Sequence, residues 1–231
     1  MPPAGPGSGG YLRPAAAIGR AADALPRAGG PASIGAMARP NRSDERRREV
    51  IRPVAETFAE LGYRRTTTAV LAERCGLQEV ALYRLWPDKK AMFVAAIEFV
   101  GDNTERIWDG LIAGGRTGKG APSAAERLLA HEAKHLGEFG FHRILFAGFS
   151  ETDDEDVRAA LKAVYTRLLR RIADMVEGHR DSGAAGLPAA AMTAWALVGL
   201  GTATNLGREL GLLGERARGE LFASVGRQLL G

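Results

Sequence analysis

The chain of 231 residues is 45% hydrophobic and 25% charged, which is typical of a globular protein with a small domain and one larger core. Its single cysteine excludes a disulfide framework and favours a reducing cytoplasm, and no apolar run reaches the ~18 residues of a membrane span. The charge is uneven: residues 39–90 hold 12 Lys or Arg against 8 Asp or Glu, a net of +4, whereas residues 91–231 hold 16 against 18, a net of −2.

Residues 1–38 contain eight Gly and six Pro and almost no large apolar side chain. Such a segment cannot bury enough surface to offset the entropy lost on ordering, so we expect a disordered tail. No continuous apolar stretch precedes a cleavage site, which argues against a signal peptide. We favour the interpretation that the native protein starts at Met37.

The first helix is predicted to open at Ser43 or Asp44 and to end at Gly62. Its apolar residues recur at helical spacing, and they are Val50, Val54, Phe58 and Leu61. Pro53 lies inside this pattern, so we expect it to kink the helix or to mark its first turn.

Two short helices are predicted next, on either side of a turn at Gly76. Thr66 and Thr67 are good N-caps for the first of them, and Cys75 lies on its inner face. The second helix has roughly seven residues and buries Leu82, a length suited to the major groove of DNA. Together they predict a helix-turn-helix.

This stretch resembles the DNA-binding domain of TetR-type, tetracycline-repressor-like, transcriptional regulators. The similarity extends from Asp44 to Phe93 and is carried by the run T-T-T-A-V-L-A-E-R-C-G-L-Q-E-V-A-L-Y-R-L-W-P-D-K-K-A-M-F. The chain departs from the family pattern at Gln78, Val80, Leu85 and Trp86. The resemblance implies a dimeric regulator whose last two helices form a four-helix interface with their copies.

Asp88 is predicted to cap a long helix that runs to about Asp109 and connects this domain to the rest of the chain. A Gly-rich loop, 110–122, follows. Further helices are predicted at 123–139, 141–150, 154–179, 188–210 and 215–230, and no strand pattern is present. We therefore predict an all-α fold: a three-helix DNA-binding domain at 39–90 and a helical effector-binding and dimerisation domain at 91–231. The helix at 188–210 is apolar almost all round and must be covered on several sides.

His131, Glu132 and His135 form an H-E-x-x-H motif, which on a helix can bind zinc and supply a general base. The longer metzincin-type pattern places a third His ten residues after the first, and Phe141 occupies that position. The same segment is also an ordinary amphipathic helix. We expect no metal site, no cofactor and no enzyme; a zinc peptidase and a helical adaptor without DNA binding are the alternatives.

We therefore predict a cytoplasmic regulator, a repressor that binds a palindromic DNA operator as a homodimer and responds to a small-molecule effector. Phosphate contacts are assigned to Thr67, Tyr83 and Lys89, the last of which matches the lysine usual in the family. Base reading is assigned to Gln78, Glu79 and Arg84, whose side chains suit adenine, cytosine and guanine respectively. Glu79 has a second interpretation as an acid that favours the first helical turn. The effector-pocket candidates combine apolar or aromatic surface with polar groups, and they are Trp108, Phe139, His142, Phe146, Phe149, Tyr165 and Trp195.

Overall fold

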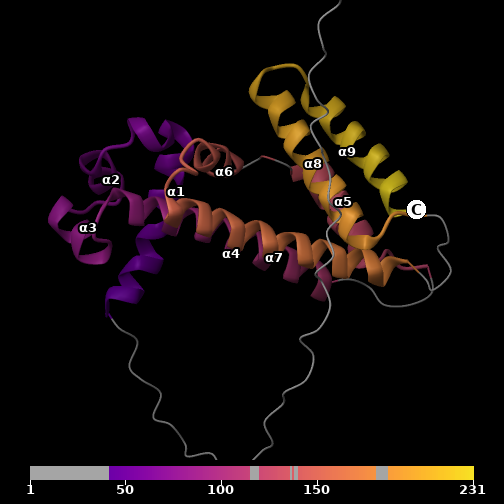
Figure 1. The fold of residues 1–231 in the computed structure, drawn as a ribbon, viewed down its shortest axis with the longest axis horizontal. Helices are drawn as coiled ribbons and strands as arrows, with labels where there is room; N and C mark the ends of the chain where they lie inside the picture. Colours follow the sequence, from indigo (N-terminus) through magenta and orange to yellow (C-terminus); the bar gives the residue numbers. More distant parts are fainter. Residues whose placement is uncertain (1–41, 115–119, 136, 138–139, 181–186) are drawn as a thin grey trace, which may run out of the picture. The chain divides into compact units, whose positions relative to one another are not determined.

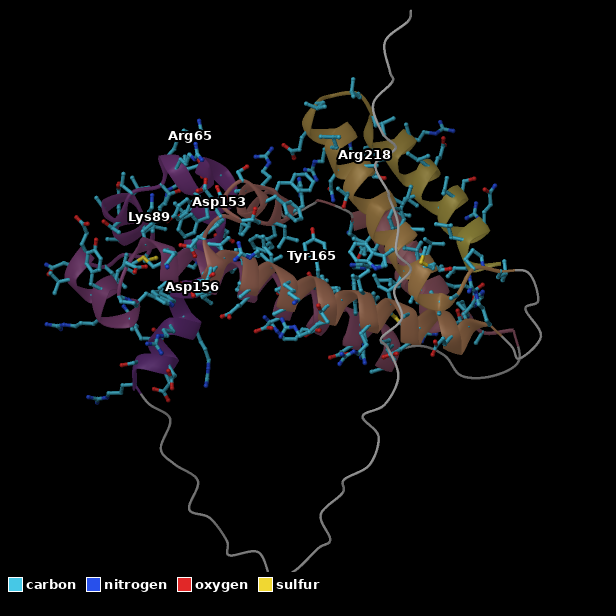
Figure 2. All side chains as sticks on the ribbon, viewed as in Figure 1. Arg65, Lys89, Asp153, Asp156, Tyr165 and Arg218 are labelled. Carbon is cyan, nitrogen blue, oxygen red and sulfur yellow. The ribbon has the colours of Figure 1, made fainter. Side chains whose placement is uncertain are left out.

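The computed structural model describes residues 42–114, 120–135, 137, 140–180 and 187–231 (Figure 1), whose side chains are drawn in Figure 2. These residues form helices and no strands, which confirms the predicted all-α class. The predicted tail at 1–38 lies outside the described residues. In chain order the helices are α1 (Arg42–Arg65), α2 (Thr68–Arg74), α3 (Glu79–Leu85), α4 (Lys89–Ala113), α5 (Ala124–His135), α6 (His142–Phe149), α7 (Glu155–His179), α8 (Ala190–Glu209) and α9 (Glu215–Leu230).

Helix α1 buries the predicted apolar face, including Val50, Val54 and Phe58. Pro53 lies inside the helix, which continues past it although proline lacks the N–H of a regular helical turn. The break falls instead at Gly62, where φ is 74° and ψ is 167°. Glycine tolerates this conformation because it has no Cβ. The sequence thus predicted the position of the break, and helical hydrogen bonding resumes beyond it as far as Arg65.

Helices α2 and α3 are joined by a tight turn. The hydroxyl of Thr67 accepts a hydrogen bond of 3.3 Å from the backbone N–H of Val70 and caps α2, as predicted. Gly76 has a φ of 61°, a value that favours glycine, and the chain enters α3 soon afterwards. Leu82, on the inner face of α3, is fully buried. The opposite face of this helix of 7 residues therefore points outward.

Helix α4 begins as predicted, because Asp88 Oδ1 accepts a hydrogen bond of 2.7 Å from the backbone N–H of Ala91. It runs to Ala113, beyond the predicted loop boundary at Gly110. One glycine costs a helix only about 1 kcal/mol relative to alanine. The apolar contacts of the neighbouring Leu111 and Ile112 with the core are sufficient to offset that cost.

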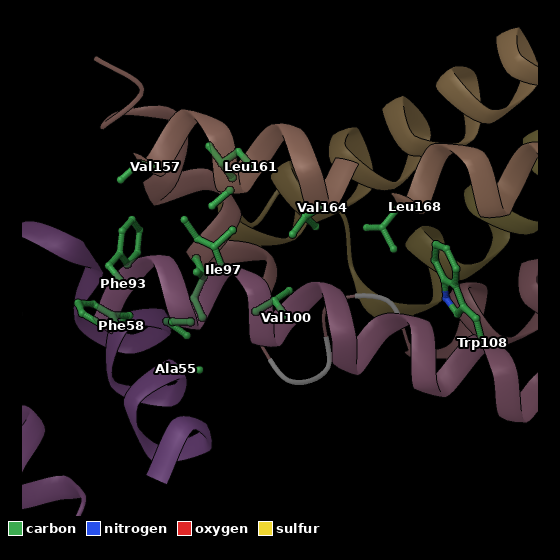
Figure 3. Packing of buried hydrophobic residues seen from close by; sticks show 14 of the residues in the cluster. Ala55, Phe58, Phe93, Ile97, Val100, Trp108, Val157, Leu161, Val164 and Leu168 are labelled. Carbon is green, nitrogen blue, oxygen red and sulfur yellow. The ribbon is translucent and has the colours of Figure 1, made fainter. Parts of the chain in front are cut away.

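An aromatic cluster joins α1 to α4. The ring of Phe93 lies 5.0 Å from that of Phe58 and 4.8 Å from that of Tyr63, measured between centroids. Phe58 and Phe93 are both fully buried (Figure 3). The three helices of the helix-turn-helix domain are thereby attached to the start of the long helix.

Helix α4 then packs along α7, with Ile97 and Val100 on one helix and Val164 on the other (Figure 3). Gly101 lies at the closest approach, where an added Cβ would come within 2.9 Å of Val164 Cγ2. The body is completed by α8 against α7 and by α9 against α5 and α8. Its helices enclose the space in which the candidate effector cavity lies.

Arg180, which follows the end of α7, holds three parts of the body together. Its guanidinium donates to the carbonyl oxygens of Leu229 at 2.8 Å and Leu230 at 3.2 Å, and to Thr193 Oγ1 at 2.9 Å. It also donates to the carbonyl of Pro188. The end of α7, the start of α8 and the end of α9 are therefore connected through one side chain.

Arg180→Ala is expected to lower the free energy of unfolding by about 2–4 kcal/mol, because partly buried carbonyls lose charge-assisted hydrogen bonds. Urea denaturation followed by circular dichroism measures the change. Arg170→Ala, an exposed position on α7, is the matched control, and its expected effect is within about 0.5 kcal/mol. Equal stability losses in the two variants would show that the Arg180 contacts do not stabilise the fold.

Candidate DNA-binding surface and effector cavity

The outward face of α3 carries the residues to which base reading was assigned. Gln78, Glu79 and Arg84 are exposed, as is Tyr83, with 46% of its surface accessible. Gln78 is the N-cap residue of α3, but its side chain makes no capping hydrogen bond. Its amide can therefore point away from the helix. The predicted contact residues of α3 thus share one solvent-facing surface.

Two of these side chains are held by α2. Thr68 Oγ1 donates a 2.6 Å hydrogen bond to Glu79 Oε2, and Tyr83 Oη donates to Thr68 Oγ1 at 3.3 Å. This chain of hydrogen bonds orients Tyr83 and Glu79 relative to the start of α2. Thr68 was not among the predicted site residues, although a third consecutive threonine at a helix start was a usable signal.

Thr67 and Lys89 lie beside the same surface but differ in their freedom to contact phosphate. Thr67 is exposed, and its hydroxyl accepts a hydrogen bond within α2, so the hydroxyl hydrogen can donate outward. Lys89 is half-buried (Figure 2). Its Nζ donates to the carbonyls of Tyr63 at 3.2 Å and Thr66 at 3.1 Å and lies 4.4 Å from the centre of the Tyr63 ring. Of the three N–H groups of this ammonium, one is left to reach a phosphate.

A cavity of about 160 Å³ lies within the body. Four of the predicted effector-pocket residues line it: Trp108, His142, Phe146 and Tyr165. Phe149 and Trp195 do not line it and are 50% and 57% exposed. Phe139 lies outside the described residues. Four of the predicted residues thus line one cavity, whereas Phe149 and Trp195 are exposed.

Most of the cavity wall is apolar. Sequence reasoning had not assigned these lining residues to the pocket: Leu128, Leu129, Leu145, Leu168, Ile172, Met175, Val176, Leu197, Val198, Phe222 and Leu230. They come from α5 to α9, so the cavity depends on the packing of the whole body. An apolar wall with few polar groups is the usual composition of a small-molecule site.

Glu132 and His142 are the ionisable groups of the wall other than Tyr165. Trp108 Nε1 donates a 3.1 Å hydrogen bond to Glu132 Oε1, and burial raises the pKa of this carboxyl despite that bond and the nearby His135. His142 Nε2 lies 2.9 Å from Glu209 Oε1, and burial lowers the pKa of this imidazole although Glu209 acts in the opposite direction. Burial raises the pKa of the Tyr165 hydroxyl as well.

The H-E-x-x-H motif lies partly in the wall of the cavity. Its glutamate faces Trp108 and the cavity, while the rings of His131 and His135 lie 4.7 Å apart. Within the described residues, no group of three or more His, Cys, Asp or Glu side chains is placed to hold a metal ion. The glutamate of the motif, Glu132, thus forms part of the cavity wall.

Helix α8 exposes a continuous apolar stripe. Met192, Trp195 and Leu206 have 64%, 57% and 51% of their surfaces accessible. Gly199 lies between them on the same face, because the spacings of three, four and seven residues follow the helical repeat. The other side of α8 is buried at Ala194 and Leu197. Apolar residues therefore lie on both the buried and the exposed side of α8, in agreement with the predicted pattern. No other segment of the described chain packs on the exposed apolar side.

A helix-turn-helix with an exposed second helix in a basic segment, attached to a helical body with an apolar cavity, is an arrangement typical of DNA-binding transcriptional regulators. The family model described as bacterial regulatory proteins, tetR family, matches residues 54–96. The matched residues lie in α1 to α4, so the helix-turn-helix region of this chain is similar to that family's DNA-binding domain.

Two relatives are similar to this chain over part of its length. The nucleoid occlusion factor SlmA of Photobacterium profundum is 41% identical over 64 residues, which are 27% of this chain and 33% of the relative. SlmA of Aliivibrio fischeri is 45% identical over 65 residues, 28% of this chain and 33% of the relative. The chain thus spans about a third of the length of these relatives.

The structural similarity to solved proteins covers more of the chain. The solved TetR-family transcriptional regulator of Cytophaga hutchinsonii superposes with a TM-score of 0.65 at 14% identity, over 82% of this chain and 95% of that structure. This likeness shows the fold of the body as well as of the DNA-binding domain. Across the described helices, none combines the length and the apolar character needed to cross a membrane.

Proposed function

We propose that the protein is a homodimeric, ligand-responsive transcriptional repressor that binds a palindromic DNA operator in the cytoplasm and has no enzymatic activity. The observation that carries the proposal is the outward face of α3, which is fixed by α2 and α1 and presents polar side chains of the right size for base edges. We assign DNA binding to residues 39–90, and effector binding and dimerisation to residues 91–231.

The contacts divide into phosphate and base contacts. Thr67, at the N-terminus of α2, and the hydroxyl of Tyr83 are proposed to bind phosphate oxygens, with the remaining N–H of Lys89 as a third contact. Arg84 and Gln78 are proposed to read guanine and adenine edges. Glu79 already accepts a hydrogen bond from Thr68, so its contact with a cytosine would use the other lone pairs of its carboxylate.

The exposed stripe of α8 supports the proposed dimer. Burial of Met192, Trp195 and Leu206 against the same residues of a second copy would cover a contiguous apolar surface that a monomer leaves in water. A palindromic operator requires a two-fold arrangement of the two α3 helices, which a symmetric dimer provides.

Effector control follows from linkage between the cavity and DNA. A ligand weakens operator binding only to the extent that it prefers body conformations in which the two α3 helices are wrongly spaced. Helix α4 links the two sites directly, because Trp108 in the cavity wall and Lys89 beside the helix-turn-helix belong to the same helix.

The proposal is tested by selecting operator DNA from a random pool with the purified protein. A palindromic consensus is the expected result, and its half-site spacing gives the distance between the two recognition helices. Enrichment of no sequence, together with binding that is insensitive to salt, would exclude a DNA-binding regulator.

Arg84→Ala is expected to weaken binding to the selected operator by about 1–3 kcal/mol, while binding to random DNA changes little. The preference at one symmetric pair of bases should relax. Fluorescence anisotropy with operator and scrambled duplexes measures both effects, and Lys162→Ala on the exposed side of α7 is the control. Equal losses on both duplexes would place Arg84 on the DNA backbone instead of a base.

A further inference from the structure

The cavity of the body has a wall chemistry that selects among ligands. None of the lining residues is Lys or Arg, whereas Glu132 contributes a carboxyl group. A ligand carboxylate or phosphate would thus meet a like charge and no cation to neutralise it. The inference below rests on the proposed function, since it specifies the ligand class of the same effector site.

No Lys or Arg among the described residues of the cavity wall compensates the negative charge of an ionised Glu132. The neutral indole of Trp108 donates a hydrogen bond to it, and burial raises the pKa of the carboxyl more than Trp108 and His135 lower it. Removing a carboxylate from water without a close cation is unfavourable. A ligand that brings a positive charge into the cavity would supply a cation on this side of Glu132, where none of the described lining residues is Lys or Arg.

Two other polar atoms in the wall residues lack a hydrogen-bond partner within the described chain. Of the buried side-chain polar atoms in the described residues, His142 Nδ1 and Asn205 Oδ1 have no partner, and both residues line this cavity. The side chain of His142 is 9% exposed. Because its Nε2 faces the Glu209 carboxylate and burial favours the neutral ring, Nδ1 carries a lone pair and accepts. A ligand with N–H groups satisfies such acceptors, and a ligand without donors does not.

The size of the cavity limits the apolar part of the ligand. A volume of about 160 Å³ is close to that of the engineered lysozyme cavity of about 150 Å³ that binds benzene. Aromatic rings from Trp108, Phe146 and Tyr165 take part in the wall and can face a ring or an ammonium group. A single ring with a short polar arm fills this space.

We infer that the cavity binds a small aromatic primary amine in its ammonium form, with the ammonium group at Glu132 and the ring among the apolar side chains of α5 to α9. A primary amine is preferred over a quaternary ammonium ion, because only the primary amine has N–H groups that can donate to the acceptors of the wall. The positive charge distinguishes it from an alcohol of the same shape and from an acid.

Isothermal titration calorimetry on the full chain, without DNA, tests this inference with three probes of one shape: benzylamine, benzyl alcohol and benzoate. Benzylamine is expected to bind at least about tenfold more tightly than benzyl alcohol, the ratio that one charge-assisted contact supplies. Benzoate is expected not to bind. Binding of benzoate as tight as that of benzylamine, or binding of none of the three, overturns the inference.

Glu132→Gln keeps the shape and an acceptor for Trp108 but removes the charge. Benzylamine should then lose its advantage over benzyl alcohol, while benzyl alcohol binds as before. Lys134→Ala, a change on the same helix outside the cavity wall, is the control and should keep the wild-type ratio. A tenfold preference that survives in a folded Glu132→Gln variant, as judged by its melting curve, contradicts the assignment of the ammonium group. Should Glu132→Gln not fold, the wild-type comparison of benzylamine with benzoate still decides.

Operator binding of the wild-type protein without ligand separates this inference from the proposed function. If the protein binds its selected operator and the amine does not bind, the ligand class is wrong and the regulator stands. If the amine binds and no operator is found, the cavity assignment stands without the regulator.

Discussion

Trp195→Glu is expected to convert the proposed dimer into a monomer at micromolar concentration and to reduce operator affinity by more than about 100-fold. Trp195 lies in the centre of the exposed α8 stripe, between Met192 and Gly199, and aromatic residues in such positions contribute most to interface stability. A glutamate there would be buried without a partner against its own copy. The proposed dimer would bind its operator through two linked half-site contacts, and losing that linkage costs on the order of 10²–10⁴ in affinity.

Sedimentation velocity measures the association state, and fluorescence anisotropy with the selected operator measures the affinity. Thr166→Glu, an exposed charge change on α7, is the matched control and should leave both quantities unchanged. A Trp195→Glu protein that sediments as a dimer with full operator affinity would show that the α8 stripe is not the interface.

Phe93→Ala is expected to lower the free energy of unfolding by about 3–5 kcal/mol. The ring is fully buried between α1 and α4 and contacts Phe58 and Tyr63, so its removal leaves a cavity at the attachment of the DNA-binding domain. Chemical denaturation gives the stability loss. Operator affinity should fall at temperatures where the wild-type domain is still ordered.

Phe93→Leu is the matched variant, because it keeps an apolar side chain of similar size, and its expected cost is under about 1.5 kcal/mol. A similar small cost for Phe93→Ala would show that the aromatic cluster contributes little to holding α1 on α4.

Helix boundaries were predictable where a local chemical signal marks them. Thr67 and Asp88 cap α2 and α4 through their own side chains, and Gly62 and Gly76 take conformations that other residues avoid. The end of α4 was less predictable, since Gly110 is tolerated in a helix whose neighbours pack on the core. Packing of that kind depends on residues far along the chain.

The sequence indicated the residue types of the candidate site, but only in part which side chains point into the cavity. The apolar character of Trp195 and Phe149 is equally suited to a cavity and to an exposed interface, and sequence spacing does not say which helix covers them. The H-E-x-x-H spacing likewise fits a zinc site or a helix whose glutamate faces a cavity. The interaction of Thr68 with α3 depends on the angle between two helices, which the sequence does not encode locally.

The two hydrogen bonds from Lys89 Nζ to backbone carbonyls fix the start of α4 to the helix-turn-helix. They bind the first turn of α4 to Tyr63 and Thr66, the residues that lead into α2, so the helix-turn-helix cannot pivot freely on α4. Trp108 lies about 28 Å further along the helix at about 1.5 Å per residue. A displacement of about 2.5 Å there corresponds to a tilt of about 5° along this length. If α4 moves as one rigid helix, α3 would turn through the same angle, which in the proposed regulator changes its fit to the DNA.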